Sequence, residues 1–128
     1  MHYDIQLDEE NKVVTVTAGG AWSSATDNAM IRELMTAVEA KGAQNVLLDI
    51  RELEFDLPMI QIFERAREMR EERLKRNRVS SKVALVYSAA NPKLDADMQF
   101  FETASRNRGL PYQVFTDVNE AREWLKQP

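Results

Sequence analysis

The amino-acid sequence predicts one α/β domain over residues 1–128, in which helices flank a mixed, mostly parallel five-stranded sheet. Residues 46–51 and 82–87 are near-continuous apolar runs, which are typical of strands buried on both faces of a parallel sheet. Segments with helical spacing of apolar residues lie before and after each run, as crossovers between parallel strands require. The predicted order of elements is β-β-α-β-α-β-α-β-α.

The first two predicted strands form a hairpin. Residues 3–7 alternate apolar and polar side chains, and residues 13–18 place valines on both faces. The polar turn at residues 8–11 is short enough to make the two strands antiparallel. Gly19-Gly20 is expected to end the second strand. Right-handed crossovers then make strands two to five parallel, with the first strand antiparallel beside them.

Two helices are predicted before and after the central strand. The first begins among the N-cap candidates of residues 23–27 and ends at Gly42. Residues 51–57 are expected to be a connection, and the second helix runs from Pro58 to about Asn77. The apolar positions of these helices are Met30, Ile31, Leu34, Met35 and Val38, and then Met59, Ile62, Phe63, Ala66, Met69 and Leu74.

The remaining elements are two helices and a strand. The third helix begins at Asn91-Pro92, and Gly109 lies just beyond its end. Residues 111–115 form the last strand, and Asp117 caps the last helix. The apolar positions of these helices are Leu94, Met98, Phe101 and Ala104, and then Val118, Ala121, Trp124 and Leu125.

Composition narrows the functional classes. The chain has no cysteine, which excludes disulfides, thiolate nucleophiles and thiolate metal sites. Its net charge of -4 argues against a nucleic-acid partner, because phosphate binding needs a basic face. Its apolar runs are too short to span a bilayer, and the N-terminus lacks a signal pattern. We therefore expect a soluble protein of the cytoplasm.

The loops after the parallel strands are where an α/β sheet places ligands and partners. The only histidine, His2, lies at a terminus that we expect to be frayed, so a catalytic triad is not expected. Ser23, Ser24 and Ser88 are interpreted as cap and turn residues. The acids Asp49, Glu52, Glu54 and Asp56 permit a divalent metal site. Stabilisation of acids by a helix N-terminus is the explanation that we favour.

Three segments carry a family resemblance. Residues 16–22 (VTAGGAW) are a strand ending before a helix, and in residues 48–55 (LDIRELEF) an aspartate precedes an aromatic by six positions. Residues 115–125 (FTDVNEAREWL) form the closing strand end and helix. With the order of elements, these segments resemble the STAS fold of sulphate transporters and anti-sigma-factor antagonists, particularly its SpoIIAA-like branch. The resemblance implies a bacterial, non-catalytic domain that binds a protein partner.

The resemblance also locates a regulatory position. In the antagonist branch, a serine at the start of the helix after the central strand accepts phosphate and switches binding to a partner kinase. The corresponding residues here are Asp56-Leu57-Pro58-Met59, which include neither serine nor threonine. We therefore expect phosphate control to be absent at this position.

These observations predict a regulatory protein-interaction module that uses no cofactor. Phe55 and Leu57 are expected to be apolar anchors, with neighbouring charges setting specificity. The expected partner-binding residues are Arg51, Phe55, Asp56, Leu57, Gln61, Arg65 and Glu68.

Two other functions stay open at this point. Met59, Phe63, Met98 and Phe101 would suit a carrier of a small apolar, lipid-like ligand, since methionine adapts to irregular pockets. A metal-dependent enzyme using the carboxylates around Asp56 is the less favoured alternative. Self-association into a homodimer is also open, because the hairpin leaves a sheet edge exposed.

Overall fold

The computed structural model describes residues 1–41, 45–54, 64, 67, 68, 71, 82–90, 92–107, 109 and 111–127. Its strands are β1 (His2–Asp8), β2 (Val13–Ala21), β3 (Asn45–Glu54), β4 (Val83–Val86) and β5 (Tyr112–Phe115). Its helices are α1 (Ser24–Lys41), α3 (Pro92–Asn107) and α4 (Val118–Lys126). Most of the helix expected over residues 58–77 lies outside the described residues. Those described within it are Glu64, Arg67, Glu68 and Glu71, all helical and exposed.

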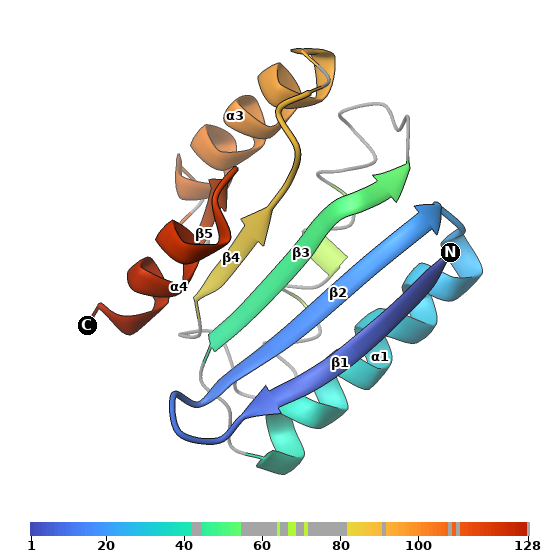
Figure 1. The fold of residues 1–128 in the computed structure, drawn as a ribbon, viewed down its shortest axis with the longest axis vertical. Coiled ribbons are helices and arrows are strands. Elements are labelled where there is room, and N and C mark those ends of the chain that lie inside the picture. Colours follow the sequence, from blue (N-terminus) through green and yellow to red (C-terminus); the bar gives the residue numbers. More distant parts are fainter. Residues whose placement is uncertain are drawn as a thin grey trace.

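The five strands form one sheet in the order β1-β2-β3-β4-β5 (Figure 1). β1 pairs antiparallel with β2, and the three other neighbouring pairs are parallel. β3 occupies the centre, as its near-continuous apolar run predicts. The predicted α/β class, mixed sheet and strand directions are therefore confirmed.

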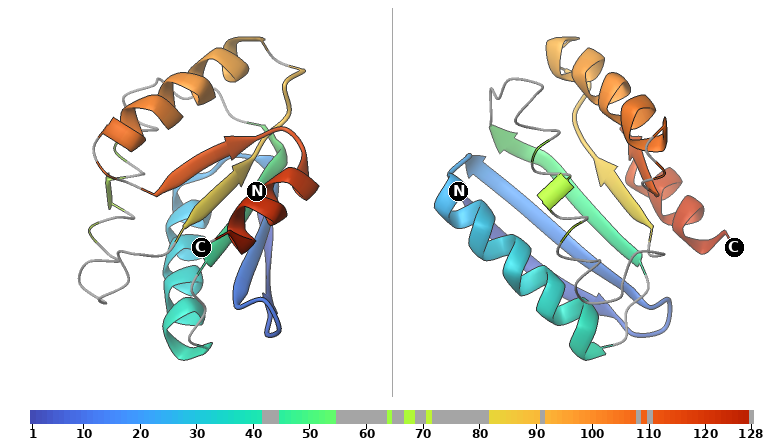
Figure 2. Two further views of the ribbon diagram at one scale, coloured as in Figure 1. Left: turned by 90° about the vertical axis from the view of Figure 1, so that its left-hand side faces the viewer. Right: turned by 180° about the vertical axis from the view of Figure 1, so that it is seen from behind.

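The described helices cover both faces of the sheet, with α1 and α3 on one side and α4 on the other (Figure 2). Alternate residues of β3 supply the two cores. Val46 and Ile50 join α1 and α3 in the larger core, whereas Leu47 joins α4 in the smaller one. Because successive side chains of a strand point to opposite faces, one strand contributes to both cores.

The helix stripes predicted from apolar spacing are confirmed where the structure describes them. In α1, Met30, Leu34 and Val38 are buried, with Ile31 partly buried beside them. The serine hydroxyl of Ser23 accepts a hydrogen bond from the Thr26 N–H, as an N-cap does. The buried residues of the other two helices are Met98, Phe101 and Ser105 in α3 and Ala121 and Leu125 in α4.

Two sequence-based boundaries were wrong at the carboxyl ends of β2 and β3. Gly19 and Gly20 lie within β2 instead of ending it, and residues 51–54 belong to β3 instead of a connection. The register shifts between Thr17 and Gly19, where β2 advances by two residues and β3 by three. The extra residue of β3 forms a β-bulge, after which the two strands pair again. Gly20 lies close to it with a φ of 80°, a left-handed conformation that glycine adopts without steric cost.

Among the described helices, none is long and apolar enough to cross a membrane.

Substitution of Leu34 tests the larger core. Leu34 is fully buried between α1 and the sheet, so Leu34→Ala should lower the free energy of unfolding by about 2–5 kcal/mol. Thr36→Ala, at an exposed position of the same helix, should change it by less than about 0.5 kcal/mol. Urea denaturation of both variants measures the difference, and equal effects would contradict the assignment of Leu34 to the core.

Candidate functional site

The carboxyl rim is the edge of the sheet at which β2, β3, β4 and β5 end. Its described residues are Trp22-Ser23, Arg51 to Glu54, Tyr87-Ser88 and Thr116-Asp117. Because the four strands are parallel, these segments meet at one edge although they are distant in sequence. The rim was predicted from the strand directions and is confirmed for these segments.

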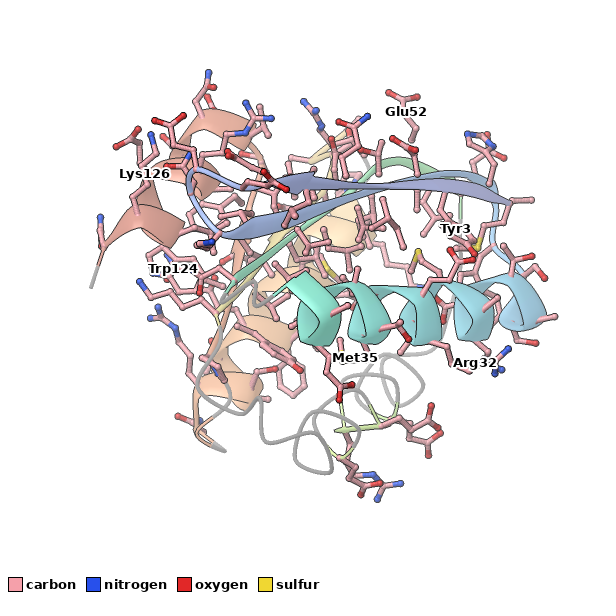
Figure 3. All side chains as sticks on the ribbon, turned by 90° about the horizontal axis from the view of Figure 1, so that it is seen from below. Tyr3, Arg32, Met35, Glu52, Trp124 and Lys126 are labelled. Carbon is pink, nitrogen blue, oxygen red and sulfur yellow. The ribbon has the colours of Figure 1, made fainter. Side chains whose placement is uncertain are left out.

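The end of β3 places charged side chains on the open part of the rim. Residues 52–54 pair with residues 19–21 of β2, and the Trp22 N–H continues the pairing by donating to the Glu54 carbonyl at 2.9 Å. Leu53 packs against the larger core. Arg51, Glu52 and Glu54 are exposed, and Figure 3 shows Glu52 projecting from the sheet face opposite α1.

Asp49 and Arg51 form a bidentate ion pair on the face that α4 partly covers. The two guanidinium donors, Nε and Nη2, lie 3.0 and 2.7 Å from Oδ1 and Oδ2 of Asp49. The Arg51 backbone N–H also donates to Oδ1 at 3.1 Å. Only 12% of the Asp49 side chain is exposed, against 42% for Arg51. The acid is thus a structural partner of Arg51 in this arrangement.

The pair changes how Asp49 titrates. Burial alone would raise the pKa of Asp49, but the hydrogen bonds and charge of Arg51 outweigh burial, so the pKa lies below its ordinary value. Arg122 on α4 lowers it further. The pKa of Arg51 is raised, chiefly by its hydrogen bond to Asp49. Both groups are therefore charged at neutral pH.

Tyr87, directly after β4, is fully buried and anchors the start of α3. Its hydroxyl donates to Asp95 at 2.5 Å and accepts from the Gln99 amide at 3.0 Å. Burial, followed by the hydrogen bond to Asp95, raises the pKa of Tyr87. Sequence inspection did not identify this cluster, although Asp95 and Gln99 are four residues apart on one helix face.

The other polar residues of the rim form helix caps and turns. This confirms the prediction for Ser23 and Ser88. Ser23 caps α1, and the Ser88 hydroxyl accepts from the Ala90 N–H at 3.3 Å. Asp117 caps α4 by accepting from the N–H groups of Asn119 and Glu120 at 2.7 and 3.3 Å. Ser24 is the exposed first residue of α1.

His2 was expected to be frayed, and this expectation was wrong. It is the first residue of β1 and lies opposite Gly19. A Cβ at Gly19 would lie 2.7 Å from Nε2 of His2, so the glycine leaves room for the imidazole ring. β2 continues past residue 18, so its Gly19 pairs with His2 and orders the N-terminus.

The structure describes only part of the predicted partner-binding surface. Arg51 lies at the rim and Glu68 is exposed. The other predicted residues lie outside the described part of the chain, namely Phe55, Asp56, Leu57, Gln61 and Arg65.

The described residues that the sequence offered for metal or ligand binding do not form such a site. Within the described ranges, no three histidine or acidic side chains gather in a metal-binding arrangement. Met98 and Phe101 occupy the larger core, where Phe101 stacks on Tyr112 with ring centroids 6.2 Å apart. Asp56, Met59 and Phe63 lie outside the described residues.

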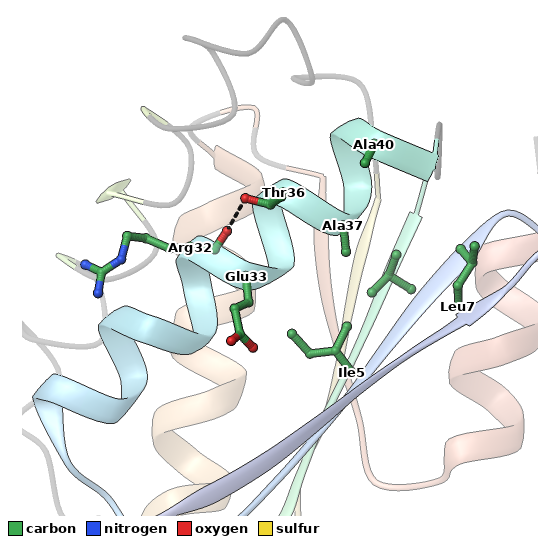
Figure 4. A pocket seen from close by; sticks show the side chains of 8 residues that line it. Ile5, Leu7, Arg32, Glu33, Thr36, Ala37 and Ala40 are labelled. Atoms are coloured by element: carbon green, nitrogen blue, oxygen red, sulfur yellow. Dashed lines mark hydrogen bonds between the residues drawn. The ribbon is translucent and has the colours of Figure 1, made fainter.

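An apolar groove of about 460 Å³ lies between β1 and α1, at the edge of the sheet away from β5. Figure 4 shows Ile5 and Leu7 on one side of it and Ala37 and Ala40 on the other. A second cleft, of about 420 Å³, lies between the β1–β2 hairpin and α4 and is lined partly by Arg122 and Lys126. The exposed edge was predicted from the sequence, whereas the groove and the cleft were not.

No protein-family model and no curated protein matches the sequence. Solved structures do share the fold. An anti-sigma factor antagonist from Mycobacterium paratuberculosis superposes with a TM-score of 0.63 and 13% identity, over 98% of this chain and 96% of that chain. SpoIIAA, an anti-sigma factor antagonist in its unphosphorylated form, gives 0.62 and 12% over 99% of both chains. The chain has the STAS/SpoIIAA-like fold.

A third solved structure, of an uncharacterised protein from Shewanella loihica PV-4, has a SpoIIAA-like fold. It superposes with a TM-score of 0.55 and 20% identity, over 97% of this chain and 92% of that chain. The three superpositions span nearly the whole chain, so the resemblance found in the sequence is confirmed as one of fold.

The ion pair predicts an acid-sensitive contribution to stability. Asp49→Asn should lower the free energy of unfolding at pH 7 by about 1–3 kcal/mol, because charge-assisted hydrogen bonds are lost. Since folding lowers the Asp49 pKa, this contribution is complete above the ordinary pKa of about 4 and disappears as pH falls through the folded-state value.

Urea denaturation at pH 7 and at several values below pH 4 measures this dependence. The control is Glu123→Gln, which removes an exposed 3.5 Å ion pair with Lys126 and should have little effect at any pH. A deficit of Asp49→Asn that stays constant on acidification would show that the charge of Asp49 is not stabilising.

Tyr87→Phe should lower the free energy of unfolding by about 1 kcal/mol, because Asp95 and Gln99 lose their shared partner. Since folding raises the Tyr87 pKa, the wild-type advantage is complete below about pH 10 and decreases above it. Denaturation at pH 8 and pH 11 measures both effects. Thr36→Ala, which removes a hydroxyl at an exposed position of α1, is the control and should be nearly neutral at both pH values. An equal loss there would contradict a specific role for Tyr87.

Proposed function

We propose that this protein is a regulatory protein-interaction module that binds a protein partner at the carboxyl rim and performs no catalysis. The supporting observation is that most polar side chains of the rim are already engaged in hydrogen bonds or an ion pair within the fold. Ser23, Ser88 and Asp117 are engaged in caps and turns, and Asp49 is paired with Arg51. The exposed groups left at the end of β3 are charged side chains suited to recognition.

The proposed interface combines this rim with the segment that follows β3. Phe55 and Leu57 are apolar residues in an otherwise charged segment, and we propose them as the anchors of the interface. Protein interfaces commonly have a few apolar hot-spot residues surrounded by a polar rim. Charged and polar residues set its specificity. They are Arg51, Asp56, Gln61, Arg65 and Glu68.

The proposed class of partner is an anti-sigma factor. Two of the solved structures with this fold are anti-sigma factor antagonists, and each superposes over nearly all of this chain. With a partner of this class, the proposed location of the protein is the bacterial cytoplasm.

Phosphorylation at the start of the segment after β3 has no part in this proposal. Residues 56–59 include no hydroxyl side chain, and the Asp56 carboxylate carries less charge than a phosphate. Binding at this surface is therefore expected without prior phosphate removal.

Calorimetric titration against each anti-sigma factor of the native organism tests the proposal. The intact protein should bind one of them, and Phe55→Ala/Leu57→Ala should weaken that binding by at least about thirtyfold, because interface anchors contribute 2 kcal/mol or more. The melting temperature of the double variant should stay close to that of the intact protein.

The control variant is Glu123→Ala, at an exposed position of α4. It should bind like the intact protein. Absence of binding to every anti-sigma factor would overturn the partner class, and unchanged binding by Phe55→Ala/Leu57→Ala would overturn the interface. A large fall in the melting temperature would instead place these two residues in the core.

A further inference from the structure

The edge of the sheet at β1 is an interaction surface separate from the carboxyl rim. β1 is the first strand in the sheet order, so within the described residues one side of its backbone has no neighbouring strand (Figure 1). It is seven residues long and pairs with β2 without a register shift. It also contains no proline or lysine. Bulges and proline are devices that commonly block edge pairing, and β1 has neither; its charged side chains are Asp4 and Asp8, both exposed.

The side chains beneath this edge are apolar and incompletely covered. Tyr3, Ile5 and Leu7 point toward the larger core, yet each is only partly buried. The apolar groove beside Ile5 and Leu7 is bounded by α1, whose flank presents Ala37 and Ala40 (Figure 4). An added strand at β1 would cover both the unpaired backbone and part of this groove.

We propose that the occupant is a second copy of this chain, bound so that the two β1 strands pair antiparallel about a two-fold axis at Ile5. In this register, Tyr3 lies opposite the partner subunit's Leu7 and Asp4 lies opposite the partner subunit's Gln6. His2 lies opposite the partner subunit's Asp8. All seven residues of β1 are paired, and the interface is self-complementary as a two-fold dimer requires.

The charges of β1 select this register over its neighbours. Moving the axis to position 4 places two Asp4 carboxylates opposite each other. Moving it to position 6 places each Asp4 opposite an Asp8, and like charges directly opposite are unfavourable. With the axis at Ile5, no acid faces an acid, because each aspartate meets a glutamine or a histidine.

The side chains at positions 4 and 6 already have compatible hydrogen-bonding groups. The Gln6 amide donates one N–H to Oδ2 of Asp4 in the same strand at 2.9 Å. A carboxamide has a second N–H, which in the dimer faces the partner subunit's Asp4. Below the strands, the small side chains of Ala37 and Ala40 allow the two α1 helices to approach each other.

Disulfide trapping tests the register directly, because the natural chain has no cysteine. Opposed residues in antiparallel strands have Cα separations of about 4.5–5.5 Å, within the range of a disulfide. A mixture of Asp4→Cys and Gln6→Cys proteins should form the mixed dimer under mild oxidation. Each protein alone should cross-link far more slowly, and both positions are exposed, so folding should be retained.

Charge variants of Gln6 test the association without covalent bonds. Gln6→Lys creates two Asp4–Lys pairs across the axis and should lower the dimer dissociation constant by about fivefold at low salt. Gln6→Glu creates two acid–acid pairs and should raise the dissociation constant by about fivefold. Sedimentation equilibrium from micromolar to millimolar protein measures all three chains.

Each contrary result overturns the proposal. Faster self-cross-linking of Asp4→Cys or Gln6→Cys than of the mixture would place the axis elsewhere. Monomers at every concentration, or a dimer indifferent to both Gln6 substitutions, would exclude β1 pairing. These measurements involve no rim residue and no anti-sigma factor, so their failure is distinguishable from failure of the proposed function.

Discussion

Residues 46–50 of β3 are covered on both faces, and a strand in that position needs hydrogen-bonding neighbours on both edges and packed side chains on both sides. β2 and β4 supply the neighbours, and helices on the two faces supply the packing. Short connections cannot join parallel strands, so long crossovers are needed, and α1 and α3 are the described helices that make them. The layered architecture follows from this one requirement, and with it the gathering of four strand ends at a single rim.

At the rim, side chains of the types that often form catalytic sites stabilise the fold instead. Asp49, Asp117 and Ser23 are residue types that catalyse reactions in other sites. Here Asp49 compensates its burial by pairing with Arg51, and the other two satisfy the first N–H groups of helices. The same loops that would hold a ligand therefore hold the helices in place.

The two surfaces proposed for binding differ in physical character. At the rim, the proposed recognition uses charged side chains around two apolar anchors, which favours a partner of different chemistry. At β1, the proposed recognition uses backbone pairing between strands, and the positions of Asp4 and Asp8 select one pairing register. This favours an identical strand as the partner. Because the rim lies at the strand ends and the other surface lies along one edge, one molecule can use both.

Several site features required long-range information. Asp49 and Arg51 share a strand face at a spacing of two, yet their ion pair was not predicted, because the predicted strand ended at residue 51 and the connection was expected to begin there. The apolar-run signal fails where β3 emerges from the core, since a strand exposed on one face loses its continuous hydrophobicity. The bulge that extends the pairing depends on β2, which is distant in sequence.

Local patterning determined the types of the described elements, the helix stripes and the cap at Asp117, because each depends on residues a few positions apart. The strand directions followed from the order of these elements and the handedness of crossovers. Tertiary structure alone decided where β2 and β3 end, how His2 is held and where the groove beside α1 lies. Those features depend on which residues of different elements meet, and spacing within one element does not encode that.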